Sequence, residues 1–476
     1  MKRILPILFC LYTTAIPATE AVNIVTVGAK GDGKTDNTQI IQRAIDEASA
    51  RQEQGFIPAG TFVTGPLLLK SNTSLYLDKG AILQGIADIE IYQKMFTAWG
   101  MSGIPAFLFA LNADNIAISG EGVIDGQGQH QVFQHGNDAD GGPLRPRLLY
   151  IKSSRNIKIS GITFQNPAYW TQFYQDCDGV VIRDIKVHAH SNWNNDGIDI
   201  DSRNVQISGC EIDCDDDAIC FKSESEEICR DIIVQNCTLR SNCNAIKFGT
   251  ASQGGFQNIK VSDCRILPAS EDNIRKWYKH YPWIGVNEKS GLAGIAIESV
   301  DGGIIDNLSI SQIKMDGIQT PIFIRLGDRK RNKQGKISIL RNISIDHIKA
   351  NATGRLSCSI TGIPEQPIEE IHISHISFNL QGGASQADYS VQVKEARDAY
   401  PENKMFDSIL PAHGFYIRHA QHVYFDKISI KTRNKDIRPC FWLEDVKDAV
   451  FYSCLSNGQK AIIKGCSDSS FSTGSN

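Results

Sequence analysis

The chain has 476 residues, which is long enough for one large domain or for about two to three ordinary ones. Hydrophobic residues make up 41% and charged residues 21%, as in ordinary soluble proteins. The formal net charge of -4 excludes a nucleic-acid-binding protein that works through a broad basic surface.

The first residues have the pattern of a secretory signal peptide. Lys2 and Arg3 form a basic start, and an apolar run from Ile4 to Ile16 follows, with small residues after it. The run is shorter than the ~20 residues that a membrane-spanning helix needs. We therefore expect a cleaved signal peptide over residues 1–21 rather than an anchor, and no membrane span in the mature chain. An exported protein, periplasmic or extracellular, follows from this.

One segment near the amino terminus has a strong helical pattern. In TDNTQIIQRAIDEASA, residues 35–50, either Thr35 or Asn37 can cap a helix. Such a helix would cover the open end of a repetitive strand structure. Its apolar stripe would consist of Ile40, Ile41, Ala44, Ile45 and Ala48.

Short segments of alternating apolar and polar residues recur along the chain. Successive copies begin at 159, 182, 207, 234 and 261, and later copies follow with longer gaps. A period in the twenties, rich in Asn, Asp, Gly and β-branched residues, is typical of a strand solenoid. A leucine-rich repeat would need a fixed leucine framework, which this chain lacks. We predict an all-β parallel β-helix over residues 22–466 and a tail without structure at 467–476.

Three cysteines follow the same repeat. Cys210, Cys237 and Cys264 are each separated by 27 residues and lie in matching contexts, ISGCEI, VQNCTL and VSDCRI. In a parallel β-helix each coil lies about 4.8 Å above the last, so equivalent positions stack into columns. We expect a buried ladder of thiols here rather than disulfides or metal ligands.

A second set of strands aligns an acidic stretch with the coils after it. The segments DGIDID (196–201), DAICFK (217–222), NAIKFG (244–249), AGIAIE (293–298) and TPIFIR (320–325) share isoleucine third and Ile or Phe fifth. Strand alternation points these two positions inward and the fourth and sixth outward. The outward columns are then Asp199, Cys220, Lys247, Ala296 and Phe323, and beside them Asp201, Lys222, Gly249, Glu298 and Arg325.

The first position of these strands brings carboxylates together. Asp196 and Asp217 become neighbours, with Asp216 beside them. Like charges held that close raise at least one pKa, so one carboxyl can act as an acid while another stays ionised as a base. That pair is the minimal equipment for glycoside hydrolysis. The aspartates could equally satisfy turn backbone or bind a cation, and spacing alone leaves both interpretations open.

Several residues around the acidic stretch are candidates for substrate contact. Trp193 and Asn194 directly precede the aspartates, while His188 and His190 lie upstream and could contact substrate or be structural. The insertion between 388 and 411 could cover one end of a groove or make a subunit contact. A further insertion at 275–285 could wall the groove or pack its aromatic residues onto the coil. Those residues are Trp277, Tyr278, Tyr281 and Trp283.

The mature sequence resembles, over nearly its whole length, the polygalacturonase-like glycoside hydrolases of family 28. The segments GAKGDGKTDNTQIIQRAID, IPAGTFVTGPLLLKSNTSLYLDKGAIL, GEGVIDGQG and NPAYWTQ are similar to the family's amino-terminal cap and first coils. The run Asn194-Asn195-Asp196-Gly197 matches its Asn-x-Asp-Gly motif. The run Asp216-Asp217-Ala218-Ile219, with Lys222, matches its double-aspartate motif.

The resemblance implies a right-handed single-stranded parallel β-helix that hydrolyses a pectic polysaccharide or oligosaccharide with inversion, without a cofactor or metal. Asp216 would be the general acid, and Asp196 and Asp217 would hold and activate the attacking water. An inverting site needs its acid and base roughly 6.5 to 9.5 Å apart, a separation that successive coils can provide.

Two departures from the family pattern predict an altered specificity. The family's Gly-His-Gly histidine is Asn244 here, and its Arg-x-Lys pair, which receives the substrate's carboxylate, aligns with Ala296 and Glu298. A carboxylate in that place would bind galacturonate poorly. Lys247, Lys222 and Arg325 could supply a relocated positive site, or these three could merely balance the charge of the aspartates. Glu298 could also bind the hydroxyls of a neutral sugar. The substrate-binding residues expected are Asn194, Asn244, Lys247, Lys222, Glu298, Arg325 and Trp193.

Two other functions remain as alternatives. A pectate-lyase-like enzyme shares the solenoid and uses acidic calcium ligands, for which Asp199, Asp201, Asp213 and Asp215 are candidates. A carbohydrate-binding solenoid without activity is the other alternative. The presence of all three aspartates argues against it, because binding alone needs no paired acid and base.

Overall fold

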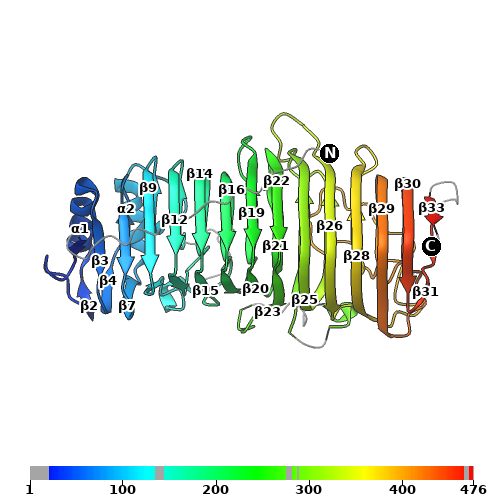
Figure 1. The fold of residues 1–476 in the computed structure, drawn as a ribbon, viewed down its shortest axis with the longest axis horizontal. Helices are drawn as coiled ribbons and strands as arrows, with labels where there is room; N and C mark the ends of the chain where they lie inside the picture. The colour runs from blue at the N-terminus through cyan, green and yellow to red at the C-terminus, as the bar shows by residue number, and fades with distance from the viewer. Residues whose placement is uncertain (1–20, 135–143, 275–280, 287–288, 466–470, 475–476) are drawn as a thin grey trace, which may run out of the picture.

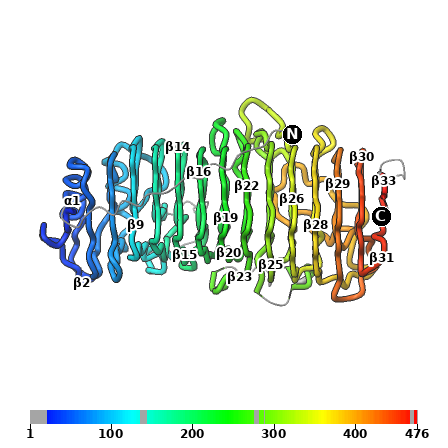
Figure 2. The backbone as a smooth tube through the Cα atoms, in the orientation of Figure 1, coloured from blue at the N-terminus to red at the C-terminus, as the bar shows by residue number. Residues whose placement is uncertain are grey.

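The strands stack into a right-handed single-stranded parallel β-helix, which confirms the predicted fold class (Figure 1). The computed structural model describes residues 21–134, 144–274, 281–286, 289–465 and 471–474. Among the strands that it names, every pairing is parallel except the short one between β30 and β31. The backbone in Figure 2 therefore advances coil by coil from the amino-terminal helix α1 to the carboxyl-terminal strands.

The elements have the following bounds. The helices are α1 (Thr38–Arg51) and α2 (Ile89–Ala98), with single 3₁₀ turns η2 (Gln131–Phe133) and η4 (Pro282–Ile284). The first strands are β1 (Ala21–Asn23), β2 (Asp32–Asp36), β3 (Gln54–Ile57), β4 (Gly60–Thr64), β5 (Leu67–Leu68), β6 (Ser74–Leu77), β7 (Ala81–Gly85), β8 (Ala106–Leu111), β9 (Asp114–Gly120), β10 (Val123–Asp125), β11 (Arg147–Lys152), β12 (Arg155–Ser160) and β13 (Thr163–Gln165).

The central strands carry the acidic stretch and the coils that follow it. They are β14 (Gln172–Arg183), β15 (Lys186–Ala189), β16 (Ile198–Ser208), β17 (Glu211–Cys214), β18 (Ile219–Ser223), β19 (Cys229–Gln235), β20 (Thr238–Ser241), β21 (Asn244–Ser252), β22 (Gly255–Ser262), β23 (Arg265–Pro268) and β24 (Gly291–Ser299). The last strands are β25 (Ile304–Leu326), β26 (Ile339–Ala352), β27 (Cys358–Thr361), β28 (Ile368–Gly382), β29 (Phe415–Asn434), β30 (Phe441–Ser456), β31 (Gln459–Lys460), β32 (Ile463–Lys464) and β33 (Phe471–Gly474).

Helix α1 covers the amino-terminal end of the coils, as predicted (Figure 1). Asn37 holds the N-cap position, but its side chain bonds the neighbouring loop instead of the helix. Asp36 takes over the capping contact by accepting a hydrogen bond from the backbone N–H of Thr38 at 2.9 Å. Most of the predicted apolar stripe is buried, while Ile40 is half-buried at its edge.

Stacked apolar side chains form the core along the axis of the β-helix. The register places one inward residue of each coil directly above its counterpart in the coil before it. Columns of β-branched residues pack closely because neighbouring strands lie about 4.8 Å apart. One such column runs through Ile159, Ile182, Ile207, Val234, Val261, Ile310, Ile345 and Ile373.

The predicted cysteine ladder is present. Cys210, Cys237 and Cys264 are buried free thiols that follow one another in the stack. Each thiol donates to the backbone carbonyl two residues before it, at 3.2 to 3.4 Å. The repeat therefore positions them as small apolar fillers.

The carboxyl-terminal segment differs from the prediction in one respect. Within the tail expected to lack structure, Phe471–Gly474 form β33, which pairs in parallel with β30. An open last coil offers unpaired backbone groups, so a short extended segment can add to it. No helix among the described residues is long and apolar enough to cross a membrane.

Candidate active site

A cleft of about 580 Å³ lies on the outward face of three successive strands, β16, β18 and β21. The register confirms the predicted alignment of these strands, because Asp199, Cys220 and Lys247 stack in one column. Most of the predicted site residues line the cleft together. They are Trp193, Asn194, Asp196, Asp216, Asp217, Lys222, Asn244 and Lys247.

A tight turn before β16 delivers Asp196 to the cleft. The side-chain oxygen of Asn195 accepts hydrogen bonds from the backbone N–H groups of Ser191 (2.9 Å) and Asn192 (2.8 Å). Its amide nitrogen donates to two carbonyls of the preceding coil. Gly197 follows, where a Cβ atom would lie only 2.4 Å from the carbonyl oxygen of the next coil, so no larger residue fits. The Asn-x-Asp-Gly motif therefore stabilises the turn before β16.

Asp217 is held in its ionised form by its neighbours. Lys247 Nζ lies 3.0 Å from one carboxyl oxygen, and the side-chain amide of Asn244 donates to the other at 2.8 Å. Burial alone would raise the pKa of Asp217, but Lys247, Lys222 and Asn244 outweigh it and lower the pKa. Asn244, which stands where the family has histidine, therefore supports a carboxylate.

The pKa of Asp196 is shifted in the opposite direction from that of Asp217. Its side chain is buried, and burial, together with the charges of Asp199 and Asp216, raises its pKa well above the usual value. Lys222 opposes this shift only in part, since its Nζ lies 3.7 Å from Asp196 and 3.1 Å from Asp199. The site thus places carboxyls of different proton affinity side by side, as the sequence predicts.

The three aspartates converge closely. An oxygen of Asp196 lies within 4.8 Å of an oxygen of Asp217, and an oxygen of Asp216 lies within 4.8 Å of Asp217. Asp216 accepts a hydrogen bond from the backbone N–H of Asp217 at 3.1 Å, which orients its carboxyl. All three aspartates line the same cleft.

Aromatic rings form one wall of the cleft. Tyr169 and Trp170 stack on each other with ring centroids 5.2 Å apart, and Lys222 Nζ lies 4.2 Å from the centroid of Trp170. Trp193 is 36% exposed and lines the same wall. Aromatic rings beside carboxylates suit the apolar face and polar edge of a pyranose.

Comparison with known proteins agrees with this chemistry. Residues 49–276 match the model of the Glycosyl hydrolases family 28. The chain is 26% identical over 412 residues to a protein of Vitis vinifera named "Probable polygalacturonase", covering 80% of this chain and 78% of that protein. These matches support glycoside hydrolase family 28. The chain is a glycoside hydrolase.

One further relative and one solved structure are similar to this enzyme. Endo-xylogalacturonan hydrolase A of Aspergillus tubingensis is 27% identical over 259 residues, which cover 52% of this chain and 61% of that protein. The crystal structure of an exopolygalacturonase from Thermotoga maritima superimposes with a TM-score of 0.61 at 22% identity. It covers 77% of this chain and 88% of its own length, and supports the shared fold.

Two predicted substrate-binding residues of the enzyme do not reach the cleft, which corrects the prediction. Glu298 is 1% exposed and accepts a hydrogen bond from Thr250 Oγ1 at 3.1 Å. Burial, only partly offset by Lys247, raises the pKa of Glu298 to about 8. Arg325 is fully buried, and its guanidinium donates to the carbonyls of Gly362, Glu395 and Ala396 at 3.0 to 3.1 Å.

The segment 393–410 accounts for the burial of Glu298 and Arg325. It packs on the outward face of β24, β25 and β29 and covers Ala296 and Phe323 with apolar side chains. Arg325 and Arg418 anchor it by donating to its backbone carbonyls. The family's cation positions are therefore covered by protein in this chain, and a small residue fits at 296. The covering side chains are Val393, Met405, Phe406 and Leu410.

The same segment supplies residues that the sequence interpretation missed. Tyr400 and Glu402 line the cleft, and the Tyr400 hydroxyl lies 3.0 Å from Thr250 Oγ1 and 3.4 Å from Lys247 Nζ. Arg329 and Arg331 reach the cleft from the loop between β25 and β26. Tyr169 and Trp170 belong to the NPAYWTQ motif, so that motif could have indicated them as cleft residues. The others come from irregular insertions and carry no repeat signal.

The aromatic insertion contributes to packing. Tyr281 and Trp283 pack against Ile284, Val286 and Leu356 rather than on the cleft. Trp277 and Tyr278 lie outside the described residues. The alternative that these rings secure the loop is therefore correct for the described pair.

The aspartates proposed as calcium ligands serve separate contacts. Asp199 pairs with Lys222, Asp201 accepts from the backbone N–H of Glu224 at 3.0 Å, and Asp213 pairs with His190 at 2.8 Å. Asn242 donates to Asp215 at 3.1 Å. Within the described part of the chain the four carboxyls do not converge on one point, so they do not form a calcium cage.

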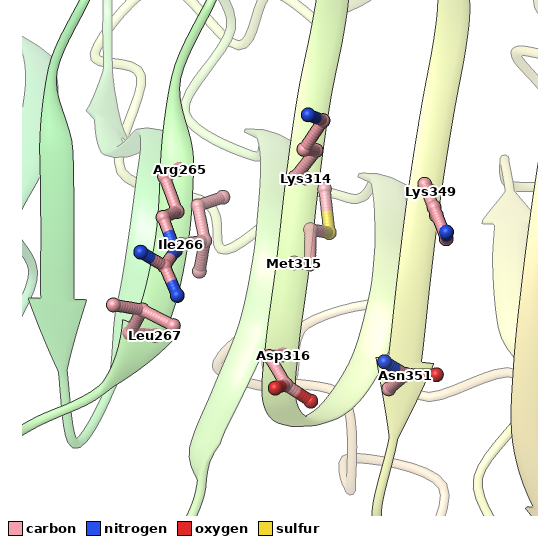
Figure 3. Close-up of a pocket in the computed structure, with 8 residues that line it drawn as sticks. All are labelled: Arg265, Ile266, Leu267, Lys314, Met315, Asp316, Lys349 and Asn351. Carbon is pink, nitrogen blue, oxygen red and sulfur yellow. The ribbon is translucent and has the colours of Figure 1, made fainter.

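A second hollow, on the face formed by β23, β25 and β26, has a different character (Figure 3). Arg265, Lys314 and Lys349 stand on successive coils there, with Asp316 as the single carboxyl. One carboxyl without a partner cannot supply both acid and base. Of these two hollows, only the cleft over β16, β18 and β21 has the several carboxyls that acid–base chemistry needs.

Proposed function

We propose that the enzyme hydrolyses a glycosidic bond in a pectic polysaccharide or oligosaccharide, with a specificity altered from plain polygalacturonase. The observation that carries the proposal is the trio Asp196, Asp216 and Asp217, which share one cleft. Two neighbours in that trio differ in proton affinity, because the pKa of Asp196 is raised and the pKa of Asp217 is lowered. The pectic relatives named above support the substrate class.

In the proposed mechanism Asp216 protonates the leaving oxygen as the glycosidic bond breaks. Asp217, kept ionised by Lys247 and Asn244, takes a proton from the attacking water, whose oxygen forms the new bond to the anomeric carbon. Asp196 lies within 4.8 Å of Asp217 and would orient that water. The lowered pKa of Asp217 supports its role as base.

Inversion of configuration is part of the proposal and rests on the family resemblance. The closest oxygens of Asp216 and Asp217 lie within 4.8 Å, below the usual range for an inverting pair, so a direct test matters here. Proton NMR of the first product formed should show the anomer opposite to that of the substrate. A first product with the substrate's own anomeric configuration would contradict inversion.

The altered specificity is supported by the distribution of cations. Lys222 and Lys247 are paired with the aspartates, Arg325 is buried, and Arg329 is held by Asp301 at 2.9 Å. Arg331 is exposed in the cleft and makes no ion pair with the described residues. We propose that Arg331 receives a carboxylate of the substrate from this new direction.

Export is also proposed. Support comes from the basic and apolar pattern of the first 21 residues, which suits cleavage and passage to the periplasm or the outside of a bacterium. Amino-terminal sequencing of protein recovered from the periplasm or the medium should begin near residue 22. An intact amino terminus retained in the cytoplasm would contradict the proposal.

A product analysis tests the main proposal. The purified protein and its Asp216→Asn variant are incubated with homogalacturonan, rhamnogalacturonan and xylogalacturonan, and the products are examined by mass spectrometry and ultraviolet absorbance. Saturated products that disappear with the variant are expected. Unsaturated products would favour a lyase, and binding without products would favour a carbohydrate-binding protein.

A further inference from the structure

We propose that His188, His190, Asp213 and Glu271 bind one divalent transition-metal ion next to the catalytic turns. His188 and His190 are two residues apart at the end of β15, so their side chains leave the strand on the same face. Asp213 of β17 is the register partner of His188 on the next coil. Glu271 reaches the same place from the segment after β23.

The donor atoms are close enough to share an ion after small adjustments. One donor atom from each of His188, His190 and Asp213 lies within 4.8 Å of the other two. His190 Nε2 is 2.8 Å from Asp213 Oδ1, and His188 Nε2 is 3.1 Å from Glu271 Oε1. Donors around a tetrahedral zinc ion stand roughly 3.4 Å apart, given bond lengths near 2.1 Å.

The donor types select the class of ion. Two imidazole nitrogens with carboxylate oxygens suit Zn²⁺, Co²⁺ or Ni²⁺, whereas Ca²⁺ and Mg²⁺ prefer sites built from oxygen alone. His190 is almost fully buried, while the side chains of His188 and Glu271 are 46% and 39% exposed. The cluster therefore has a fixed inner side and an open outer side through which an ion can enter. The guanidinium of the nearby Arg240 is held by the carbonyl of Pro268, to which it donates a hydrogen bond at 3.1 Å.

The position of the cluster suggests what the ion would do. His190 directly precedes the turn held by Asn195, and that turn leads to Asp196. Asp213 lies three residues before Asp216. An ion bound to both strands would brace the two segments that carry these aspartates, without touching the substrate.

A second histidine and aspartate cluster offers a matched contrast. The rings of His347 and His375 stack face to face, 4.3 Å apart, and both direct Nδ1 at Asp346. Lys427 Nζ lies 3.3 Å from His375 Nε2, so an ammonium group contacts the second ring nitrogen of His375. The rings of His188 and His190 meet at 64°, and neither ring has such a lysine contact among the described residues. We expect no ion at the second cluster.

Metal titration tests the proposal with the full mature protein after treatment with a chelator and dialysis. Isothermal calorimetry with Zn²⁺, and visible absorption with Co²⁺, should show one ion per chain. His188→Ala should weaken binding at least tenfold, and His347→Ala should leave it unchanged. Zn²⁺ should also raise the unfolding temperature of the wild type but not of His188→Ala.

Several outcomes would overturn the proposal. They are an absence of binding by the wild type, equal binding by His188→Ala, and a loss of binding in His347→Ala. If His188→Ala does not fold by circular dichroism, Glu271→Gln on the exposed loop replaces it. That variant should bind Zn²⁺ more weakly than the wild type, and equal affinity would contradict a role for Glu271 and for the cluster.

Discussion

The outward face of the β-helix has two regions that follow the same register but have opposite surroundings. Over β16, β18 and β21 the outward residues support an open cleft with three aspartates and two lysines. Over β24, β25 and β29 the columns continue as Ala296 and Phe323, buried beneath the segment 393–410. Register therefore decides which side chains stack, while an inserted segment decides whether the stack meets substrate.

Replacing the proposed general acid, Asp216, in the open region should have the largest effect. Asp216→Asn keeps the shape of the side chain but cannot donate a proton in the same way, so we expect turnover to fall about 10²- to 10⁴-fold. The unfolding temperature should change little. Product release is measured beside Asp114→Asn, the same change at an exposed site, which should retain full activity. Comparable activity in both variants would remove the role of Asp216.

Rebuilding the family cation on the covered region should damage the fold rather than the specificity. Ala296→Arg forces a large charged group against Phe323, Met405 and Phe406, which should destabilise the protein by about 1–3 kcal/mol or more. Ala251→Arg makes the same change at the open cleft, where less than about 0.5 kcal/mol is expected. Urea unfolding measures both. Equal stabilities would show that the segment does not cover residue 296 in solution.

The stability of the folded protein should depend on pH through Glu298, which lies at the border between the two regions. Its pKa is about 8 in the folded protein against 4.5 for an ordinary glutamate, mainly because of burial. A raised carboxyl pKa favours folding most below pH 4.5, and this contribution is lost as pH rises toward 8. Glu298→Gln should therefore gain stability relative to the wild type as pH increases from 5 to 8. A difference that stays constant with pH would contradict the shift.

Substitution of Arg331 should have the smallest effect on activity, and it tests which residue binds the substrate's carboxylate. Arg331→Gln removes a charge-assisted contact, so KM for an acidic oligosaccharide should rise about tenfold with kcat nearly unchanged. The methyl-esterified oligosaccharide should be little affected. Lys333→Gln, an exposed change on the same loop, is the control. An equal loss on both substrates would mean that Arg331 does not read the carboxylate.

The sequence alone determined the repeat and everything that the repeat controls. The β-helix, the cysteine ladder, the capping helix and the meeting of Asp196, Asp216 and Asp217 could all be predicted. The reason is that strand alternation and a constant strand spacing convert sequence period directly into stacked columns. The motif residues that lie on the coils inherit their positions from this geometry.

Only the tertiary structure decided how the insertions fold back. Glu298 and Arg325 occupy the predicted columns but are buried, because the segment 393–410, which lies much later in the chain, covers that face. Tyr400 and Arg331 enter the cleft from irregular loops whose paths follow no period. Such segments are placed by burial of apolar side chains and by hydrogen bonds to buried arginines, which are long-range effects that local sequence does not encode.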